Sequence, residues 1–160
     1  ILKKVPLLDV FSISVGFLIR LVTGIYLVGE NPTNWIVLCT MFLALFLGFA
    51  KRRAEIHSIG NRNEFKQRPV LKLYNKDFLD ALVNETAFGA IISYSLFASI
   101  SGKNQLLLIT IPIVYFAISY YRQSLFNNEL GEEPESVILE NKVIITCIFA
   151  WIVTYIFLTY

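Results

Sequence analysis

The chain has 160 residues, of which 56% are hydrophobic and 16% are charged, and its formal net charge is +2. Soluble domains carry about 25% charged residues, so this composition excludes an ordinary soluble domain and indicates an integral membrane protein. Cys39 and Cys147 both lie in apolar runs, so we interpret them as small core residues rather than as a disulfide or a metal pair. His57 is the only histidine, which excludes a histidine-rich metal site built from this chain.

Five apolar segments follow one another, each close to the length of about 20 residues that a helix needs to cross a bilayer. No segment alternates with period two, and a backbone in lipid must satisfy its own hydrogen bonds, so helices are predicted rather than a barrel. We expect an all-α, polytopic membrane bundle with helices at Leu7–Val28, Asn34–Ala50, Phe78–Ile100, Leu106–Tyr121 and Val143–Tyr160.

The connections between these segments differ in charge, and the difference predicts the orientation. The turns at 29–33 and 101–105 are nearly free of basic residues, whereas the loop at about 51–77 is rich in lysine and arginine. Basic loops stay in the cytoplasm. The loop at about 51–77 is therefore predicted on the cytoplasmic side, and helix counting places the acidic loop at about 122–142 there too.

No internal repeat divides the sequence, so residues 1–160 are expected to form one membrane domain. The chain begins without Met and directly at the edge of its first apolar segment. We therefore expect it to be the C-terminal part of a longer polypeptide.

Polar residues inside the first segment are costly to place in lipid. Asp9, Gly16 and Arg20 are spaced by seven and four residues, which puts them on one helix face, and Gly24 extends the stripe. An arginine inside the hydrocarbon is a candidate functional residue, and the alternative is a snorkelling or inter-helix arginine. The glycines indicate that this face looks into a packed bundle.

Lys51, Arg52 and Glu55 stand at the spacing at which side chains on one helix surface meet. One interpretation is an ion pair at a helix end, together with basic residues that fix the orientation. The other is a phosphate-binding site, because a long basic loop follows, and guanidinium and ammonium groups suit phosphate oxygens. The residues alone leave both interpretations open.

Asp77, Asp80 and Asn84 share one face at the start of the third segment. Oxygen ligands at this spacing could hold Mg²⁺. The alternative is a polar helix start, in which Asn75 or Asp77 caps the helix and acids occupy its first turn.

Several motifs occur in an order that carries a resemblance. The specific ones are Lys51-Arg52-x-Ala54-Glu55 and Gly131-Glu132-Glu133-Pro134-Glu135. They are accompanied by Leu8-Asp9-Val10, Gly16 to Arg20, Gly24, Trp35, Leu45 to Gly48, and Arg68-Pro69-Val70-Leu71 with Tyr74, Phe78 and Leu79. The chain resembles, over essentially its whole length, the UbiA superfamily of intramembrane prenyltransferases, and within it the decaprenyl-phosphate phosphoribosyltransferase-like branch. It departs from that branch at Asn141-Lys142, where an Asp-Arg pair is usual.

The resemblance implies a nine-helix bundle with a central cavity, in which the five segments are helices five to nine. It implies transfer of 5-phosphoribosyl from phosphoribosyl diphosphate to a polyprenyl phosphate, with Mg²⁺ as cofactor and no nucleic-acid partner. The acidic N-D-x-x-D-x-x-x-D motif that would hold most of the metal is absent from this sequence, so this part alone is expected to be inactive. The Lys51–Glu55 element stands where related enzymes carry a second Asp-rich motif.

The resemblance also suggests residue roles. Lys51 and Arg52 are expected to hold the donor phosphates, with Glu55 orienting them. The expected substrate-binding residues are Asp9, Arg68, Tyr74 and Arg122, and the candidate metal ligands are Asp77 and Asp80. Two other functions stay open: prenyl transfer from a prenyl diphosphate to an aromatic or lipid acceptor, and a non-enzymatic transporter or subunit in which Asp9, Arg20 and Glu85 line a passage.

Overall fold

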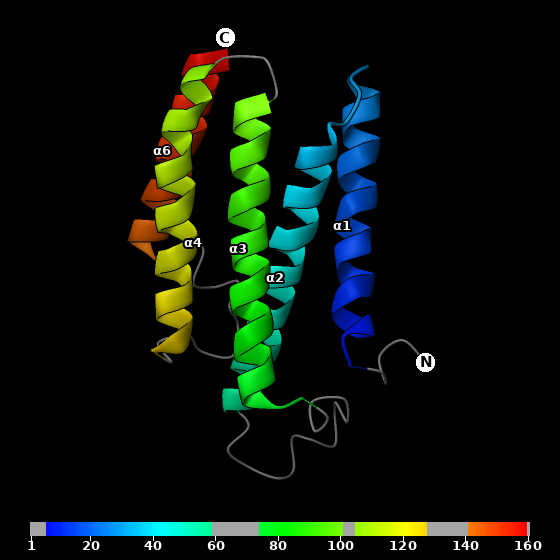
Figure 1. Ribbon diagram of the computed structural model, residues 1–160, viewed down its shortest axis with the longest axis vertical. Coiled ribbons are helices and arrows are strands. Elements are labelled where there is room, and N and C mark those ends of the chain that lie inside the picture. The colour runs from blue at the N-terminus through cyan, green and yellow to red at the C-terminus, as the bar shows by residue number, and fades with distance from the viewer. Residues whose placement is uncertain (1–5, 59–73, 101–104, 128–140, 160) are drawn as a thin grey trace.

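The computed structural model describes residues 6–58, 74–100, 105–127 and 141–159. Every element in these ranges is helical, which confirms the all-α class (Figure 1). The elements are α1 (Leu8–Leu27), α2 (Asn34–Ser58), α3 (Lys76–Ile100), the 3₁₀ helix η4 (Gln105–Thr110), α4 (Ile111–Phe126) and α6 (Lys142–Thr159). Five helical spans are long and apolar enough to cross a membrane, which supports the prediction of an integral membrane protein.

Two helices extend further than their apolar runs. In the structure α2 continues to Ser58 and α4 to Phe126. The loops predicted at about 51–77 and 122–142 therefore begin several residues later than predicted. Lysine, arginine, alanine and glutamate are good helix formers, and an Arg52–Glu55 ion pair spans one turn of α2. Hydropathy marks where the apolar run ends, whereas these residues let the helix continue past that point.

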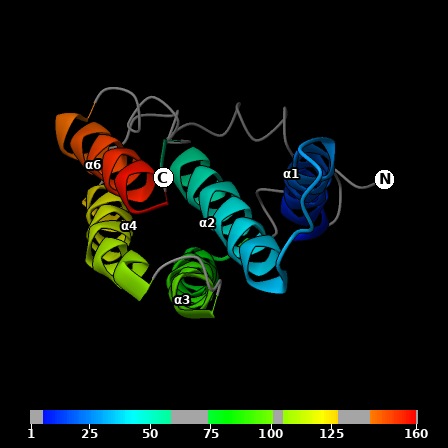
Figure 2. The same cartoon turned by 90° about the horizontal axis from the view of Figure 1, so that it is seen from above.

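The long helices run side by side and alternate in direction (Figure 1). Several charged residues, such as Asp9, Arg52 and Asp80, lie near the helix ends at the bottom of that view. We call this the charged end; it carries the first turns of α1 and α3 and the last turns of α2 and α4, whereas α6 begins further up the bundle. Seen from above, α2 lies between α1 on one side and α3, α4 and α6 on the other (Figure 2).

Two glycines allow close approach to α2. A Cβ on Gly48 of α2 would lie 2.5 Å from Cγ1 of Val10, and a Cβ on Gly89 of α3 would lie 2.7–2.9 Å from the Phe42 ring. Neither position has room for a larger residue without movement of its neighbour. The helices α1 and α3 therefore pack tightly on opposite sides of α2, around fully buried side chains such as Phe46.

Away from the charged end, a chain of hydrogen bonds joins three elements. The Trp151 indole N–H donates to the Tyr94 hydroxyl at 2.7 Å, which lies 2.6 Å from Oγ1 of Thr110. Thr110 donates to the Leu107 carbonyl at 2.6 Å, so Tyr94 is the donor to Thr110. This chain connects α6 and α3 to η4 and satisfies each of its polar atoms, as a buried site requires.

Beyond Asp9, which is buried, the predicted stripe on α1 is open. A Cβ on Gly16 or Gly24 would meet nothing within 4 Å, and Arg20 is exposed, with its guanidinium 5.7 Å from the centroid of its neighbour Phe17. The packed surroundings predicted for this stripe are therefore not found within the described residues.

Candidate functional site

Arg52 is the centre of an ion-pair network at the charged end. Its Nε donates to Oδ2 of Asp9 at 2.7 Å, and its Nη1 donates to Oε2 of Glu55 at 2.6 Å. Arg52 is only 8% exposed and Asp9 7%. Charges removed from water to this extent are costly unless they are paired and hydrogen-bonded. The two carboxylates therefore fix the guanidinium between the start of α1 and the end of α2.

Tyr74 completes this network from the approach to α3. Its hydroxyl donates to Oδ1 of Asp9 at 3.1 Å and accepts the backbone N–H of Leu7 at 2.6 Å. Leu7 precedes α1 with φ 71°, a left-handed conformation that costs energy for a residue with a side chain. Burial, followed by the interaction with Asp9, raises the pKa of Tyr74 to about 12, so the phenol stays neutral and donates. We call Asp9, Arg52, Glu55 and Tyr74 the Arg52 network.

The Arg52 network brings together four of the residues predicted for the site, from three separate parts of the chain. It also indicates a different role for one of them. Arg52 was predicted to hold donor phosphates, but two of its nitrogens are already bound to carboxylates. In this arrangement Arg52 positions the acids and the helix ends around it, and a phosphate would have to compete with both carboxylates.

The other predicted residues are spread over the same end of the bundle. Lys51 is half-buried on α2, one residue before Arg52, and Arg122 is half-buried near the end of α4. Arg68 and the loop at 131–135 lie outside the described residues. Asn141, one of the two departures from the branch pattern, caps α6 by accepting the backbone N–H of Val143 at 3.0 Å.

Arg53 was missed by the sequence analysis, although it is more deeply buried than Arg52, at 4% exposure. Its Nε donates to Oδ1 of Asp80 at 2.5 Å and its Nη1 to the Leu125 carbonyl at 2.7 Å. Its guanidinium lies 4.6 Å from the centroid of the Phe126 ring, within range of a cation–π interaction. Arg53 thus connects α2 to α3 and α4, as Arg52 connects α2 to α1.

The two predicted metal ligands, Asp77 and Asp80, make different contacts. Asp80 pairs with Arg53, whereas Asp77 is exposed in the first turn of α3, and its backbone N–H donates to Oδ1 of Asn75 at 3.1 Å. This capping bond matches the alternative of a polar helix start. Across the described ranges, no three His, Cys, Asp or Glu side chains gather into a group that could hold a metal ion. These residues therefore do not fit a Mg²⁺ site by themselves, and metal binding by Asp77 and Asp80 stays a prediction.

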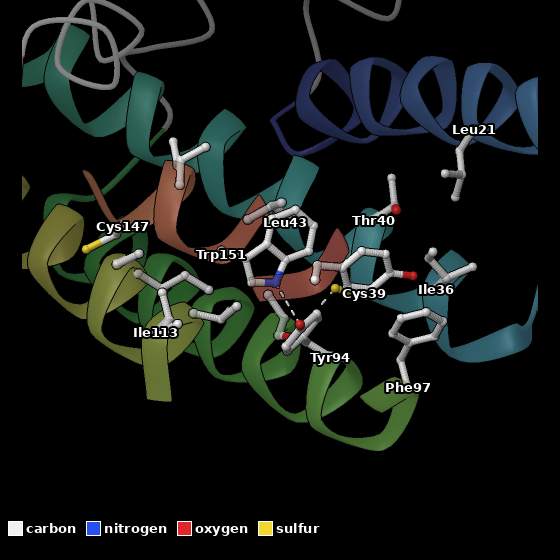
Figure 3. A pocket seen from close by; sticks show the side chains of 16 residues that line it. Leu21, Ile36, Cys39, Thr40, Leu43, Tyr94, Phe97, Ile113, Cys147 and Trp151 are labelled. Atoms are coloured by element: carbon white, nitrogen blue, oxygen red, sulfur yellow. Dashed lines mark hydrogen bonds between the residues drawn. The ribbon is translucent and has the colours of Figure 1, made fainter. Parts of the chain in front are cut away.

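An apolar cavity of about 460 Å³ lies between the helices, on the side away from the charged end. All five long helices contribute to its lining, which includes Leu43, Phe97 and Trp151 (Figure 3). Tyr94 lines it too, and the polar atoms of Tyr94 and Trp151 are both used in the hydrogen-bond chain described above. The cavity therefore offers apolar contact and few free donors, which suits a hydrocarbon chain.

Comparison with known proteins agrees with the resemblance stated in the sequence analysis. No family model matches the chain. A decaprenyl-phosphate phosphoribosyltransferase of Mycolicibacterium smegmatis is 28% identical over 163 residues, covering 96% of this chain and 51% of the relative. The Corynebacterium glutamicum protein of the same name is 28% identical over 94% of this chain and 46% of its own length, and that of Mycobacterium tuberculosis is 25% identical over 96% and 51%.

The chain thus spans about half the length of the curated relatives it matches. The resemblance to decaprenyl-phosphate phosphoribosyltransferases is confirmed.

Proposed function

We propose that the protein carrying this chain transfers 5-phosphoribosyl from phosphoribosyl diphosphate to a polyprenyl phosphate. In this reaction the bond from ribose C1 to the diphosphate oxygen breaks, and a bond from C1 to an oxygen of the lipid phosphate forms. The observation that carries the proposal is the similarity of nearly the whole chain to proteins named for this transfer. The charged end and the apolar cavity supply the two environments that a phosphorylated lipid needs.

The charged end is the proposed place of the reaction. Cationic groups that are already oriented stabilise the negative charge that develops on a leaving diphosphate. Lys51 is our candidate for direct contact with phosphate oxygens. Arg52, held by Asp9 and Glu55, acts as a positioning residue that keeps α1 and α2 in register beside the site. The acceptor is a phosphate anion, so the reaction needs no strong general base.

Mg²⁺ remains part of this proposal as a cofactor that neutralises phosphate charge when bound. Most of its ligands are proposed to come from outside the described residues, which assemble no metal-binding group by themselves. We assign no step to it.

The lipid tail is proposed to occupy the apolar cavity, with its phosphate at the charged end. Removing a hydrocarbon chain from water gains about 25 cal/mol per Å² of apolar surface, and a chain shared with the bilayer needs only part of its length inside the protein. The charged end is proposed to face the cytoplasm, because the basic residues of this end follow the positive-inside rule.

The test is transfer by the full-length protein reconstituted with polyprenyl phosphate, Mg²⁺ and radiolabelled phosphoribosyl diphosphate. Lys51→Ala and Glu55→Gln are each expected to lower kcat/KM at least about tenfold, equivalent to about 1.4 kcal/mol of transition-state stabilisation. Lys142→Ala is the matched control, because Lys142 is an exposed lysine in the first turn of α6 and belongs to no part of the proposed site. Unchanged turnover in both site variants would remove this part of α2 from the mechanism.

The same assay separates the alternative transfer. If radiolabel reaches the lipid only from a prenyl diphosphate, and not from phosphoribosyl diphosphate, the proposed function becomes prenyl transfer instead of phosphoribosyl transfer. The apolar lining of the cavity suits the prenyl chain of either substrate, so the donor has to be identified by experiment.

A further inference from the structure

A second hollow, of about 200 Å³, lies at the charged end between α2 and α3. It is lined by Arg53, Ile56, His57, Lys76 and Leu79, and we call it the basic cavity. None of the four members of the Arg52 network is among these lining residues. The basic cavity is therefore a separate feature on another side of α2.

Arg53 gives the basic cavity a fixed cationic group. Its Nε and Nη1 are bound to Asp80 and to the Leu125 carbonyl, and the Phe126 ring lies against the guanidinium. Among the described residues, Nη2 has no hydrogen-bond acceptor. A guanidinium held in this way loses little further freedom when it binds a ligand, so it is preorganised for an anion.

The remaining charges make the basic cavity positive. Asp80 offsets Arg53, whereas Lys76, at the first position of α3, adds a full positive charge to the lining. His57, in the last turn of α2, adds an imidazole nitrogen that can donate a hydrogen bond. Asp77, next to Lys76, is exposed and is not part of the lining.

The volume of the basic cavity and the groups that line it limit which ligands it can bind. A volume of about 200 Å³ is several times that needed for one water molecule. The lining supplies ammonium, imidazole and guanidinium donors, which suit a small group with several anionic oxygens, and Ile56 and Leu79 offer apolar contact to the rest of the ligand.

We propose that the basic cavity binds the phosphate group of a phosphorylated ligand, independently of the Arg52 network. The phosphate comes either from a soluble phosphate compound or from the headgroup of an anionic lipid, because the cavity lies at the end of the bundle where both can reach it. This binding does not depend on the proposed transfer reaction, and it is measured without activity.

The imidazole of His57 provides a local readout. The full-length protein is labelled with isotopes at histidine, and the His57 signals are assigned by their loss in His57→Gln. In the first arm, inorganic diphosphate is titrated into protein in neutral detergent without metal. In the second arm, no soluble phosphate is present, and nanodiscs of phosphatidylcholine alone are compared with nanodiscs that also contain phosphatidylglycerol.

A saturable shift of the His57 signals in the first arm identifies a soluble phosphate ligand, and a shift only in the second arm identifies a lipid headgroup. In either arm, Lys76→Ala is expected to weaken the response about tenfold, and Lys142→Ala is expected to leave it unchanged. Lys76→Arg, which keeps the charge, is expected to restore most of it. No shift in either arm, or equal weakening by the two alanine variants, would overturn the proposal.

Discussion

Replacing Asp9 by asparagine is expected to lower the free energy of unfolding by about 2 to 3 kcal/mol. The Asp9 and Arg52 side chains are 7% and 10% exposed, and their N–O distance is 2.7 Å. Removing one partner of a buried ion pair costs about 3 to 5 kcal/mol. The expected loss lies below most of that range, because asparagine keeps a carbonyl acceptor for Nε and because Arg52 keeps its bond to Glu55.

A double-mutant cycle isolates the interaction itself. Arg52→Met is expected to cost about 3 to 5 kcal/mol, since the Asp9 carboxylate then keeps, among the described residues, only its bond from the Tyr74 hydroxyl. The double variant is expected to cost about 2 kcal/mol less than the sum of the single changes. Unfolding is followed by tryptophan fluorescence during titration with a denaturing detergent, and exposed Asp77→Asn serves as a control within about 0.5 kcal/mol of wild type. Additivity of the two single changes to within about 0.5 kcal/mol would refute the network.

Three further substitutions test the burial of Tyr74 and the packing of the helices. Tyr74 has a folded pKa of about 12, above the unfolded value of about 10, so its contribution to stability is complete below pH 10 and is lost as pH rises towards 12. The difference in ultraviolet absorbance between wild type and Tyr74→Phe is followed as pH rises, and it should show no phenolate from Tyr74 near pH 10. A titration midpoint near pH 10 for this residue would contradict its burial beside Asp9. Gly89→Ala is expected to cost about 1 to 3 kcal/mol through its clash with Phe42. In contrast, Gly24→Ala, in open surroundings, should be neutral or stabilise by up to about 1 kcal/mol; equal effects in thermal unfolding would contradict this packing.

The positions of the helices could be predicted from the sequence because lipid and protein interiors select the same apolar side chains. The ends of the helices could not. The last turns of α2 are polar, and they are helical because their residues pair with one another and with neighbouring helices. Hydropathy does not take such pairs into account. The prediction from hydropathy therefore ends this helix at Ala50, although α2 continues to Ser58.

The candidate site was predictable in part. Spacing along one helix is enough to bring Arg52 and Glu55 together, and the structure confirms their ion pair. Asp9 contacts Arg52 and Tyr74, which are both far from it in the sequence. No local pattern predicts such contacts, and here the resemblance supplied the candidates. The hydrogen-bond chain through Tyr94, which was not predicted at all, is likewise formed by residues far apart in the sequence.

The two neighbouring arginines show why a run of cations cannot be interpreted as one surface. Adjacent residues on an α-helix point about 100° apart, so Arg52 meets the carboxylate of α1 while Arg53 meets that of α3 and a carbonyl of α4. A single basic patch would lose function gradually as its charges are removed. Two separately paired arginines should instead respond independently: changes around Arg52 should disturb the contact of α1 with α2, and changes around Arg53 should disturb the basic cavity and leave that contact intact.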